Sequence, residues 1–460
     1  MTAATTAHKG GRWIERWDPE NEQFWEAEGK HIAKRNLIFS VMSEHIGFSV
    51  WSMFSVLALF MGPEYGVDPA GKFFLVAVAS LVGATLRVPY GFAVARFGGR
   101  NWTIFSAAML LVPTIALLIV MEPGTSYSTF MLVAVLTGVG GANFASSMTN
   151  INSFYPLRLK GWALGMNAGG GNIGVAVVQL LGLLIIAIAG AANPRVLLGV
   201  YIPLIIAATV CSALYMNNLG PVKNDGGATR EAVKDRHTWI MSFLYIGTFG
   251  SFIGYSFAFG LVLTAQFGRT PLQAASLTFI GPLLGSLIRP VGGKLADRLG
   301  GARVTLVNFA LMTAAVGVVV TASFQASLPL FIGGFIVLFV LTGIGNGSTY
   351  KMIPGIYRAK ATAKGLTGEA ADVYARRLSG ASMSLIGAIG AFGGLGINLA
   401  LRQSFLTSQS GTTAFVFFLG YYVVCSAVTW AVYLRRPAAA AELPAGHAER
   451  PQRQPVYAEV

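Results

Sequence analysis

Residues 87–99 read Arg-Val-Pro-Tyr-Gly-Phe-Ala-Val-Ala-Arg-Phe-Gly-Gly, and residues 289–301 read Arg-Pro-Val-Gly-Gly-Lys-Leu-Ala-Asp-Arg-Leu-Gly-Gly. At one constant offset Arg87 matches Arg289, and the inner arginines and closing glycine pairs coincide as well. Each stretch ends an apolar segment. The repeat therefore predicts two related halves, each of which places one arginine inside a hydrophobic segment.

The composition indicates a protein that crosses a membrane many times. Of its 460 residues, 54% are hydrophobic and only 11% are charged, and the mean hydropathy is +0.61. The net charge of +14 would suit a nucleic-acid partner, but the basic residues lie in alternate short loops, which argues against nucleic-acid binding. The two cysteines, Cys211 and Cys425, lie in apolar runs, so we expect no disulfide framework, metal site or cofactor.

Twelve apolar segments are long enough to span a bilayer, six on each side of a polar linker. This pattern predicts an all-α membrane protein with twelve transmembrane helices in two pseudo-symmetric six-helix halves, which is the major facilitator architecture. The expected parts are a polar head (1–35), an N-terminal half (36–216), a linker (217–238), a C-terminal half (239–434) and a disordered tail (435–460). The expected spans are 36–61, 72–95, 102–121, 128–151, 162–189, 196–216, 239–266, 272–296, 304–323, 329–351, 380–401 and 411–434.

The basic residues of the loops predict the orientation. They fall on one side of the expected spans, whereas the opposite loops carry little positive charge together with acids such as Glu64 and Glu122. By the positive-inside rule, both termini are expected in the cytoplasm. We also expect the protein in the plasma (inner) membrane and as a monomer. The basic side comprises the head, Arg96, Arg100, Arg158, Lys160, the linker, Arg298, Arg303, the 358–377 loop, Arg435 and Arg436.

The paired arginines are the first candidate site. Arg87 and Arg289 each lie nine residues before the arginine at the membrane border, or roughly 13 Å above it at about 1.5 Å per residue. An arginine at this depth costs about 2.5–3.5 kcal/mol on insertion scales, so it needs a partner. A guanidinium group can donate two parallel hydrogen bonds to a planar oxyanion. We expect both arginines to bind one small anion, the alternatives being a structural partner acid or snorkelling.

Other polar groups lie at membrane depth. Glu44 and His45 form a candidate proton relay, and a structural pair of Glu44 with Arg87 or His45 is the alternative. Lys351 could be a gate cation or could snorkel. Asn143, Asn167 and Asn172 lie in glycine-rich helices whose glycines otherwise suit close packing. Phe48, Phe144, Tyr245 and Phe249 lie beside small residues; any one of them suits a core position, although the hydroxyl of Tyr245 favours a cavity.

Three segments that contain several of these residues resemble the signatures of the nitrate/nitrite porter family. They read Gly-Ala-Asn-Phe-Ala-Ser-Ser-Met (141–148), Gly-Met-Asn-Ala-Gly-Gly-Gly-Asn-Ile-Gly (165–174) and Gly-Asn-Gly-Ser-Thr-Tyr-Lys-Met-Ile-Pro (345–354), and the similarity runs from about residue 17 to 434. The resemblance implies that Arg87 and Arg289 clamp nitrate or nitrite. It also implies that Tyr245 and Asn172 hydrogen-bond the anion and that Phe48, Phe144 and Phe249 pack around it.

The resemblance also sets the expected function. The Glu44-His45 pair and Lys351 are more similar to the proton-coupled branch of the family than to its exchangers. We therefore expect a secondary active transporter in the lipid bilayer that takes up nitrate with protons and accepts nitrite as a second substrate. An electroneutral nitrate/nitrite antiporter is the alternative, and a membrane nitrate sensor is a more distant one. No nucleophile–base pair or metal-ligand spacing indicates an enzyme.

Overall fold

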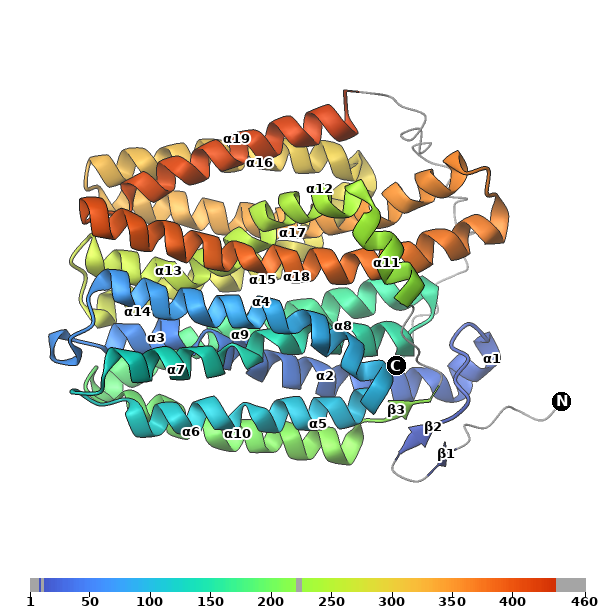
Figure 1. The fold of residues 1–460 in the computed structure, drawn as a ribbon, viewed down its shortest axis with the longest axis horizontal. Coiled ribbons are helices and arrows are strands. Elements are labelled where there is room, and N and C mark those ends of the chain that lie inside the picture. The colour runs from blue at the N-terminus through green and yellow to red at the C-terminus, as the bar shows by residue number, and fades with distance from the viewer. Residues whose placement is uncertain (1–7, 10–11, 221–225, 436–460) are drawn as a thin grey trace, which may run out of the picture.

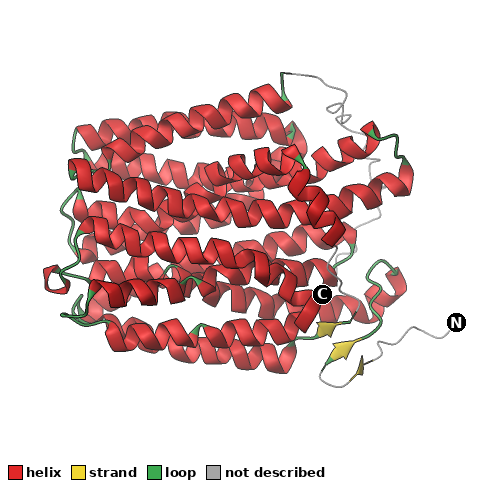
Figure 2. Ribbon diagram, in the orientation of Figure 1, coloured by secondary structure: helices red, strands yellow, loops and turns green. Residues whose placement is uncertain are grey.

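The computed structural model describes residues 8–9, 12–220 and 226–435. The described chain is a bundle of long helices lying side by side, with three short strands at one end (Figures 1 and 2). Most of the tail expected to be disordered, 436–460, lies outside the described residues.

Among the described residues, eleven helices are long and apolar enough to cross a membrane, and the bent pair α2–α3, counted as one span, makes a twelfth. This confirms the predicted all-α membrane fold. The N-terminal half contains α2 (Lys30–Trp51) with α3 (Met53–Phe60), α4 (Pro69–Phe97), α5 (Gly99–Met109) with α6 (Leu111–Val120), α7 (Tyr127–Thr137) with α8 (Val139–Phe154), α9 (Leu157–Ala189) and α10 (Pro194–Tyr215). The C-terminal half contains α12 (Arg236–Tyr245), a π-helical turn (Ile246–Gly250) and α13 (Ser251–Ala265), then α14 (Pro271–Thr278) with α15 (Ile280–Leu299), α16 (Gly301–Phe324), α17 (Leu328–Ala363), α18 (Gly368–Ser408) and α19 (Thr412–Tyr433).

The duplicated sequence gives the same local structure in both halves. In each repeat a long helix ends and the next begins across the glycine pair, where Gly98 has φ 86° and Gly300 has φ 89°. A residue with a Cβ is strained at such positive φ values, which explains the glycine in both copies. Prolines favour the first helical turn because they lack the N–H that would be unpaired there, and Pro69, Pro194 and Pro271 begin helices.

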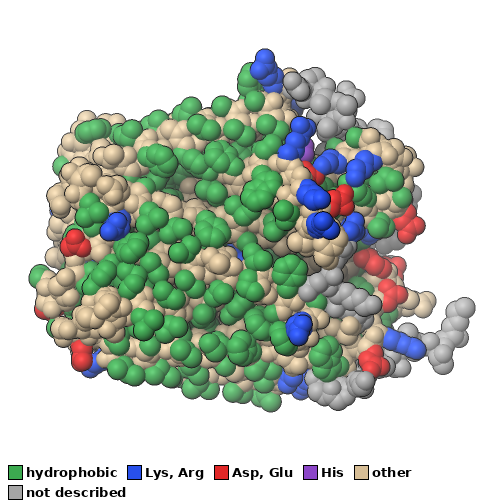
Figure 3. Space-filling view, in the orientation of Figure 1, with side chains coloured by type: hydrophobic (Ala, Val, Ile, Leu, Met, Phe, Trp, Pro, Cys, Tyr) green, Lys and Arg blue, Asp and Glu red, His purple; other side chains and the backbone are tan. Residues whose placement is uncertain are grey.

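Several helices are longer than the expected spans, which were defined by apolar residues alone. The loop expected at 358–377 is mostly helical, because α17 continues to Ala363 and α18 begins at Gly368. Apolar length measures only the part of a helix that faces lipid, and polar residues continue these helices into water. The end of the bundle where α2 begins and α19 ends is called the basic end. Lys and Arg side chains gather at this end on the face shown in Figure 3.

The two halves meet closely at the opposite end of the bundle, which we call the far end. On one side of the interface, α4 packs against α18: the rings of Phe73 and Phe405 stack with centroids 5.2 Å apart, and the Arg402 guanidinium lies 4.7 Å from the Phe74 ring. On the other side, the Gln179 amide of α9 donates a 2.7 Å hydrogen bond to the Ser256 carbonyl of α13. These contacts form the far-end closure.

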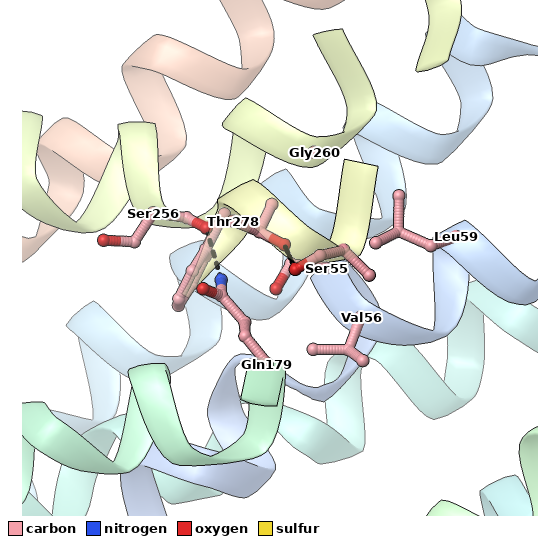
Figure 4. A pocket seen from close by; sticks show the side chains of 9 residues that line it. Ser55, Val56, Leu59, Gln179, Ser256, Gly260 and Thr278 are labelled. Atoms are coloured by element: carbon pink, nitrogen blue, oxygen red, sulfur yellow. Dashed lines mark hydrogen bonds between the residues drawn. The ribbon is translucent and has the colours of Figure 1, made fainter. Parts of the chain in front are cut away.

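A small pocket lies inside the far-end closure (Figure 4). Its wall includes Ser55, Leu59 and Gln179 from the N-terminal half and Ser256, Phe257 and Ala275 from the C-terminal half. The surrounding segments 50–61 and 247–263 are buried along their whole length. The far end is therefore closed in this conformation.

The head packs on the basic end of the N-terminal half. Strand β2 (Trp13–Ile14) pairs antiparallel with β1 (His8–Lys9) and parallel with β3 (Asn218–Leu219) of the linker. The Trp17 indole donates to the Phe154 carbonyl at 3.2 Å, and Trp25 is 3% exposed. A short helix α1 (Glu22–Phe24) and a π turn (Trp25–Gly29) lead into α2. The described residues of the head, 8–9 and 12–29, therefore pack on the protein itself.

The linker divides between the two halves. Its β3 strand belongs to the sheet on the N-terminal half, whereas α11 (Gly226–Lys234) packs on the C-terminal half. There the Glu231 carboxylate accepts a 3.2 Å hydrogen bond from the Tyr374 hydroxyl. The Asp235 carboxylate pairs with Lys360, and its other oxygen accepts from the His237 N–H at 2.8 Å and caps α12. The described parts of the linker are therefore anchored at both ends.

Candidate functional site

Arg87 lies in α4 and is 2% exposed. Its Nε donates to the Gly141 carbonyl of the same half at 3.1 Å, and its Nη1 donates to the Gly387 carbonyl of the other half at 2.8 Å. Within the described chain, its Nη2 has no hydrogen-bond partner. The guanidinium group therefore lies at the interface between the halves with one donor nitrogen free.

Aromatic rings surround this guanidinium group. Its central carbon lies 4.6 Å from the Phe144 ring, 5.1 Å from the Phe249 ring and 5.4 Å from the Trp51 ring. Phe144 and Trp51 come from the N-terminal half and Phe249 from the C-terminal half. Cation–π contacts at desolvated sites are each worth up to about 2 kcal/mol and partly replace the water that the charge has lost.

Arg289 occupies the equivalent place in α15 and is 8% exposed. Its Nη2 donates to the Tyr245 hydroxyl at 3.2 Å, and the Tyr350 ring lies 5.9 Å from its central carbon. Its Nη1 has no hydrogen-bond partner among the described residues. Tyr245 in turn stacks on Phe249, with centroids 5.3 Å apart and an angle of 11°. Because Phe249 contacts Arg87, these two rings connect the two arginines.

The two guanidinium charges have no paired counterion within the described chain, and Glu44 interacts with them only through space. Neither arginine forms an ion pair with a described carboxylate. A buried cation without a counterion is strongly destabilising, and one anion that accepts from both free nitrogens would compensate both charges. A small planar oxyanion suits this geometry because each guanidinium group presents its donors in one plane.

The other expected substrate residues divide into two groups. Phe48 joins the ring cluster, edge-on to Phe144 at 6.1 Å and to Trp51 at 5.5 Å. Asn172 of α9 is fully buried and both of its amide atoms lack a partner in the described chain, but no described contact joins it to either arginine. Its role in binding therefore stays a prediction.

Glu44 lies outside the arginine site, in a polar cluster within the N-terminal half. Its carboxylate accepts hydrogen bonds from the Ser147 hydroxyl at 2.5 Å and from the Asn167 amide at 2.7 Å, and Ser147 also contacts Ser40 at 3.0 Å. The second carboxylate oxygen has no partner among the described residues. The structural pairing of Glu44 with Arg87 or His45 is absent from the described contacts, since the ring of His45 bonds instead to the Gly170 carbonyl at 3.1 Å.

Lys351 lies away from the arginine pair. Its ammonium group forms a 2.9 Å ion pair with Asp297 of α15, and both side chains are about half exposed. The contact lies within the C-terminal half, near the basic end. The geometry gives Lys351 a local partner, and a role as a gate cation stays a prediction.

Sequence reasoning missed three residues of these clusters. Trp51 and Tyr350 lie against the two arginines, and Ser147 bonds to Glu44. The glycines of α4 and α8 indicate a large neighbour, and that neighbour is Trp51: a Cβ on Gly141 would lie 2.6 Å from its ring. Tyr350 and Ser147 lie inside the signature segments but carry no distinguishing pattern of their own.

Comparison with known proteins identifies the family. The family model of the Major Facilitator Superfamily, whose members are transporters rather than enzymes, matches residues 41–371. The "Nitrate/nitrite transporter NarU" of Salmonella typhimurium is 40% identical over 446 residues, covering 91% of this chain and 96% of the relative. The protein of that name in Escherichia coli is 38% identical, covering 93% and 98%. The "Probable nitrate/nitrite antiporter NarK2" of Thermus thermophilus is 32% identical, covering 79% and 87%. Together with the paired arginines, these similarities show that the chain belongs to the nitrate/nitrite porter family of the major facilitator superfamily.

Proposed function

We propose that this protein carries nitrate, with nitrite as a second substrate, across the plasma membrane by alternating access, with both termini in the cytoplasm. The observation that carries the proposal is the pair of buried arginines, one from each half, each with one donor nitrogen that has no partner among the described residues. The names of the relatives from Salmonella typhimurium and Escherichia coli support nitrate and nitrite as the substrates.

The site is placed to respond to movement of the halves. Arg87 contacts groups of both halves, and Arg289 belongs to the C-terminal half, so an anion held by both nitrogens would bind the halves together. Tyr245 is the last residue of α12, and Phe249 lies within the π-helical turn (Ile246–Gly250) that follows it. Such turns are frequent at functional sites because they leave part of the helix ladder irregular. A change of this turn would therefore move two substrate-site rings at once.

Glu44 is the proposed proton carrier. Nitrate uptake against an inside-negative potential costs about 2.3 kcal/mol per 100 mV for each uncompensated charge, and a co-transported proton cancels that charge. Glu44 is fully buried, is held by two donors, and keeps one oxygen without a described partner. A carboxyl group in this position can take up and release a proton without forming an ion pair in the described chain.

Electroneutral exchange of nitrate for nitrite is the second candidate. The Thermus thermophilus relative carries the name of such an antiporter. Glu44 has no described hydrogen bond or ion pair with either arginine, which also favours exchange, because coupling through Glu44 would have to act through space. Exchange needs no proton, since one monovalent anion replaces another.

Transport into proteoliposomes separates the candidates. We would measure uptake of labelled nitrate with and without an acid-outside pH gradient, and with and without nitrite inside. The variants are Glu44→Gln and, as a matched control, Glu64→Gln in an exposed far-end loop.

Proton-coupled uptake predicts that the gradient drives accumulation into empty vesicles and that only Glu44→Gln abolishes it. Exchange predicts uptake that ignores the gradient and depends on internal nitrite, with Glu44→Gln close to the unmodified protein. Saturable nitrate binding without flux under either condition would indicate a sensor and would refute transport.

A further inference from the structure

Trp51 lies where the first spanning helix breaks. It is the last residue of α2, it is fully buried, and α3 continues at an angle of 41° after Ser52. Its indole N–H donates to the Ala79 carbonyl of α4 at 2.9 Å. The ring is therefore fixed to the neighbouring helix at the point where the first span bends.

Two glycines make room for this ring. A Cβ added to Gly141 of α8 would lie 2.6 Å from the ring atoms Cδ2 and Cε2, and one added to Gly83 of α4 would lie 2.7 Å from Cε2. Real Cβ atoms do not approach other atoms so closely, so the backbones of both α4 and α8 pack directly against the indole. In a close-packed interior, a ring packed in this way cannot move independently of its neighbours.

The indole ring contacts both functional regions of the molecule. The Arg87 guanidinium group lies 5.4 Å from its centroid. The Phe257 ring of α13 meets it edge-on, with centroids 5.2 Å apart and an angle of 83°. Phe257 belongs to the other half and lines the pocket of the far-end closure. Ser256 and Gln179 line the same pocket (Figure 4). One side chain thus connects the arginine site to the closure.

We propose that Trp51 is a positioning residue that couples anion binding at Arg87 to the opening of the far-end closure. The proposal rests on the proposed function. An anion that attracts the Arg87 guanidinium group changes how that group lies on the indole. Because the indole is fixed to α4 and α8, the change reaches Phe257 across the interface instead of being absorbed by rotation of the ring.

A labelling experiment in detergent tests this coupling. The reporter is Ala275→Cys in a background with Cys211→Ala and Cys425→Ala; Ala275 lines the far-end pocket and is 1% exposed. Its rate of reaction with a maleimide therefore reports opening of the closure. The rate is measured with and without sodium nitrate, and binding of labelled nitrate is measured by equilibrium dialysis on the same samples.

The test variants remove the Trp51–Phe257 contact from opposite halves, as Trp51→Phe and Phe257→Leu. The matched control is Trp430→Phe, at a half-exposed tryptophan of α19. We expect nitrate to change the labelling rate of the reporter protein and of the control by about two- to tenfold, the range that an aromatic contact can supply. In a folded Phe257→Leu protein, nitrate binding should persist while the nitrate-dependent change in labelling is lost. A folded Trp51→Phe protein should lose the same change in labelling.

The possible failures are distinguishable. If folded test variants bind nitrate and show the full nitrate-dependent change in labelling, the coupling role of Trp51 is wrong and the proposed function stands. Loss of nitrate binding together with the response in a folded Phe257→Leu protein would overturn the proposal as well, because the contact would then act in binding. If the reporter protein with Trp51 intact neither binds nitrate nor responds to it, the proposed function itself fails.

Discussion

Replacing Arg87 by lysine tests the anion site while keeping its charge. In the structure the guanidinium group donates to the Gly141 and Gly387 carbonyls through Nε and Nη1 and keeps Nη2 for the substrate. These nitrogens lie in one plane and point in different directions. The ammonium group of lysine has its three donors on one atom, so it cannot reach all three acceptors.

The size of the effect follows from this geometry. The Gly141 and Gly387 carbonyls are fixed in the backbone, so we expect the ammonium group to keep one of them at the expense of the anion, which then loses a hydrogen bond from a charged donor worth about 1.5–3 kcal/mol. That loss corresponds to a nitrate affinity lower by about 10- to 150-fold at 25 °C. The fold is expected to persist, because the buried charge is retained and about 1 kcal/mol of backbone hydrogen bonding is lost.

The assay is saturable uptake of labelled nitrate into proteoliposomes, together with thermal denaturation of the purified variant. Arg195→Lys is the matched control, since Arg195 forms an exposed ion pair with Glu122 at the far end. We expect its uptake to equal that of the unmodified protein. An Arg87→Lys protein whose KM for nitrate stays within about threefold, less than 1 kcal/mol, would refute the reasoning.

Three further predictions concern the surroundings of the site. Gly141→Ala should lower the Tm through a clash worth about 1–3 kcal/mol with Trp51, whereas Gly165→Ala, where a Cβ meets nothing within 4 Å, should not; equal Tm values would contradict the packing described. Gln179→Leu removes a hydrogen bond between the halves worth about 0.6 kcal/mol, so labelling of Ala275→Cys should rise about threefold, and an unchanged rate would show that the bond does not hold the closure. Lys351→Met removes an exposed ion pair worth about 0–1 kcal/mol and should change nitrate uptake less than about fivefold; abolished uptake would instead support the gate role.

The fold could be predicted because its determinants are local and repeated. Apolar segments of spanning length have only helix as a stable form in a bilayer, so their number gave the number of spans. The Gly98 and Gly300 turns, both at positive φ, were visible as one glycine pair at a constant offset. Helix ends were less predictable, because α17 and α18 continue into polar sequence that lipid does not constrain.

The arginine pair was also predictable, since a cation at membrane depth has few explanations. The residues that surround the arginine pair were only partly predictable. The contact of Arg87 with Gly387 and the bond of Arg289 to Tyr245 join residues far apart in the chain, and no periodicity specifies such partners. The resemblance to the family supplied Tyr245, whereas Trp51 and Tyr350 became visible only once their rings lay against the guanidinium groups.

The partners of the charged side chains were the least predictable feature. The neighbours of Glu44 in sequence suggested a pair with His45 or, by depth, with Arg87. The structure pairs it instead with Ser147 and Asn167, which come from α8 and α9. Depth along a helix can be estimated from sequence, but the direction of a side chain around the helix depends on how the helices pack.

A structure determined with saturating nitrate is the most direct test of the central claim. The account predicts planar density between the arginines, within hydrogen-bonding distance of Arg87 Nη2 and Arg289 Nη1, the two nitrogens that have no partner among the described residues. Nitrate bound elsewhere, with both guanidinium groups in their present contacts, would contradict it.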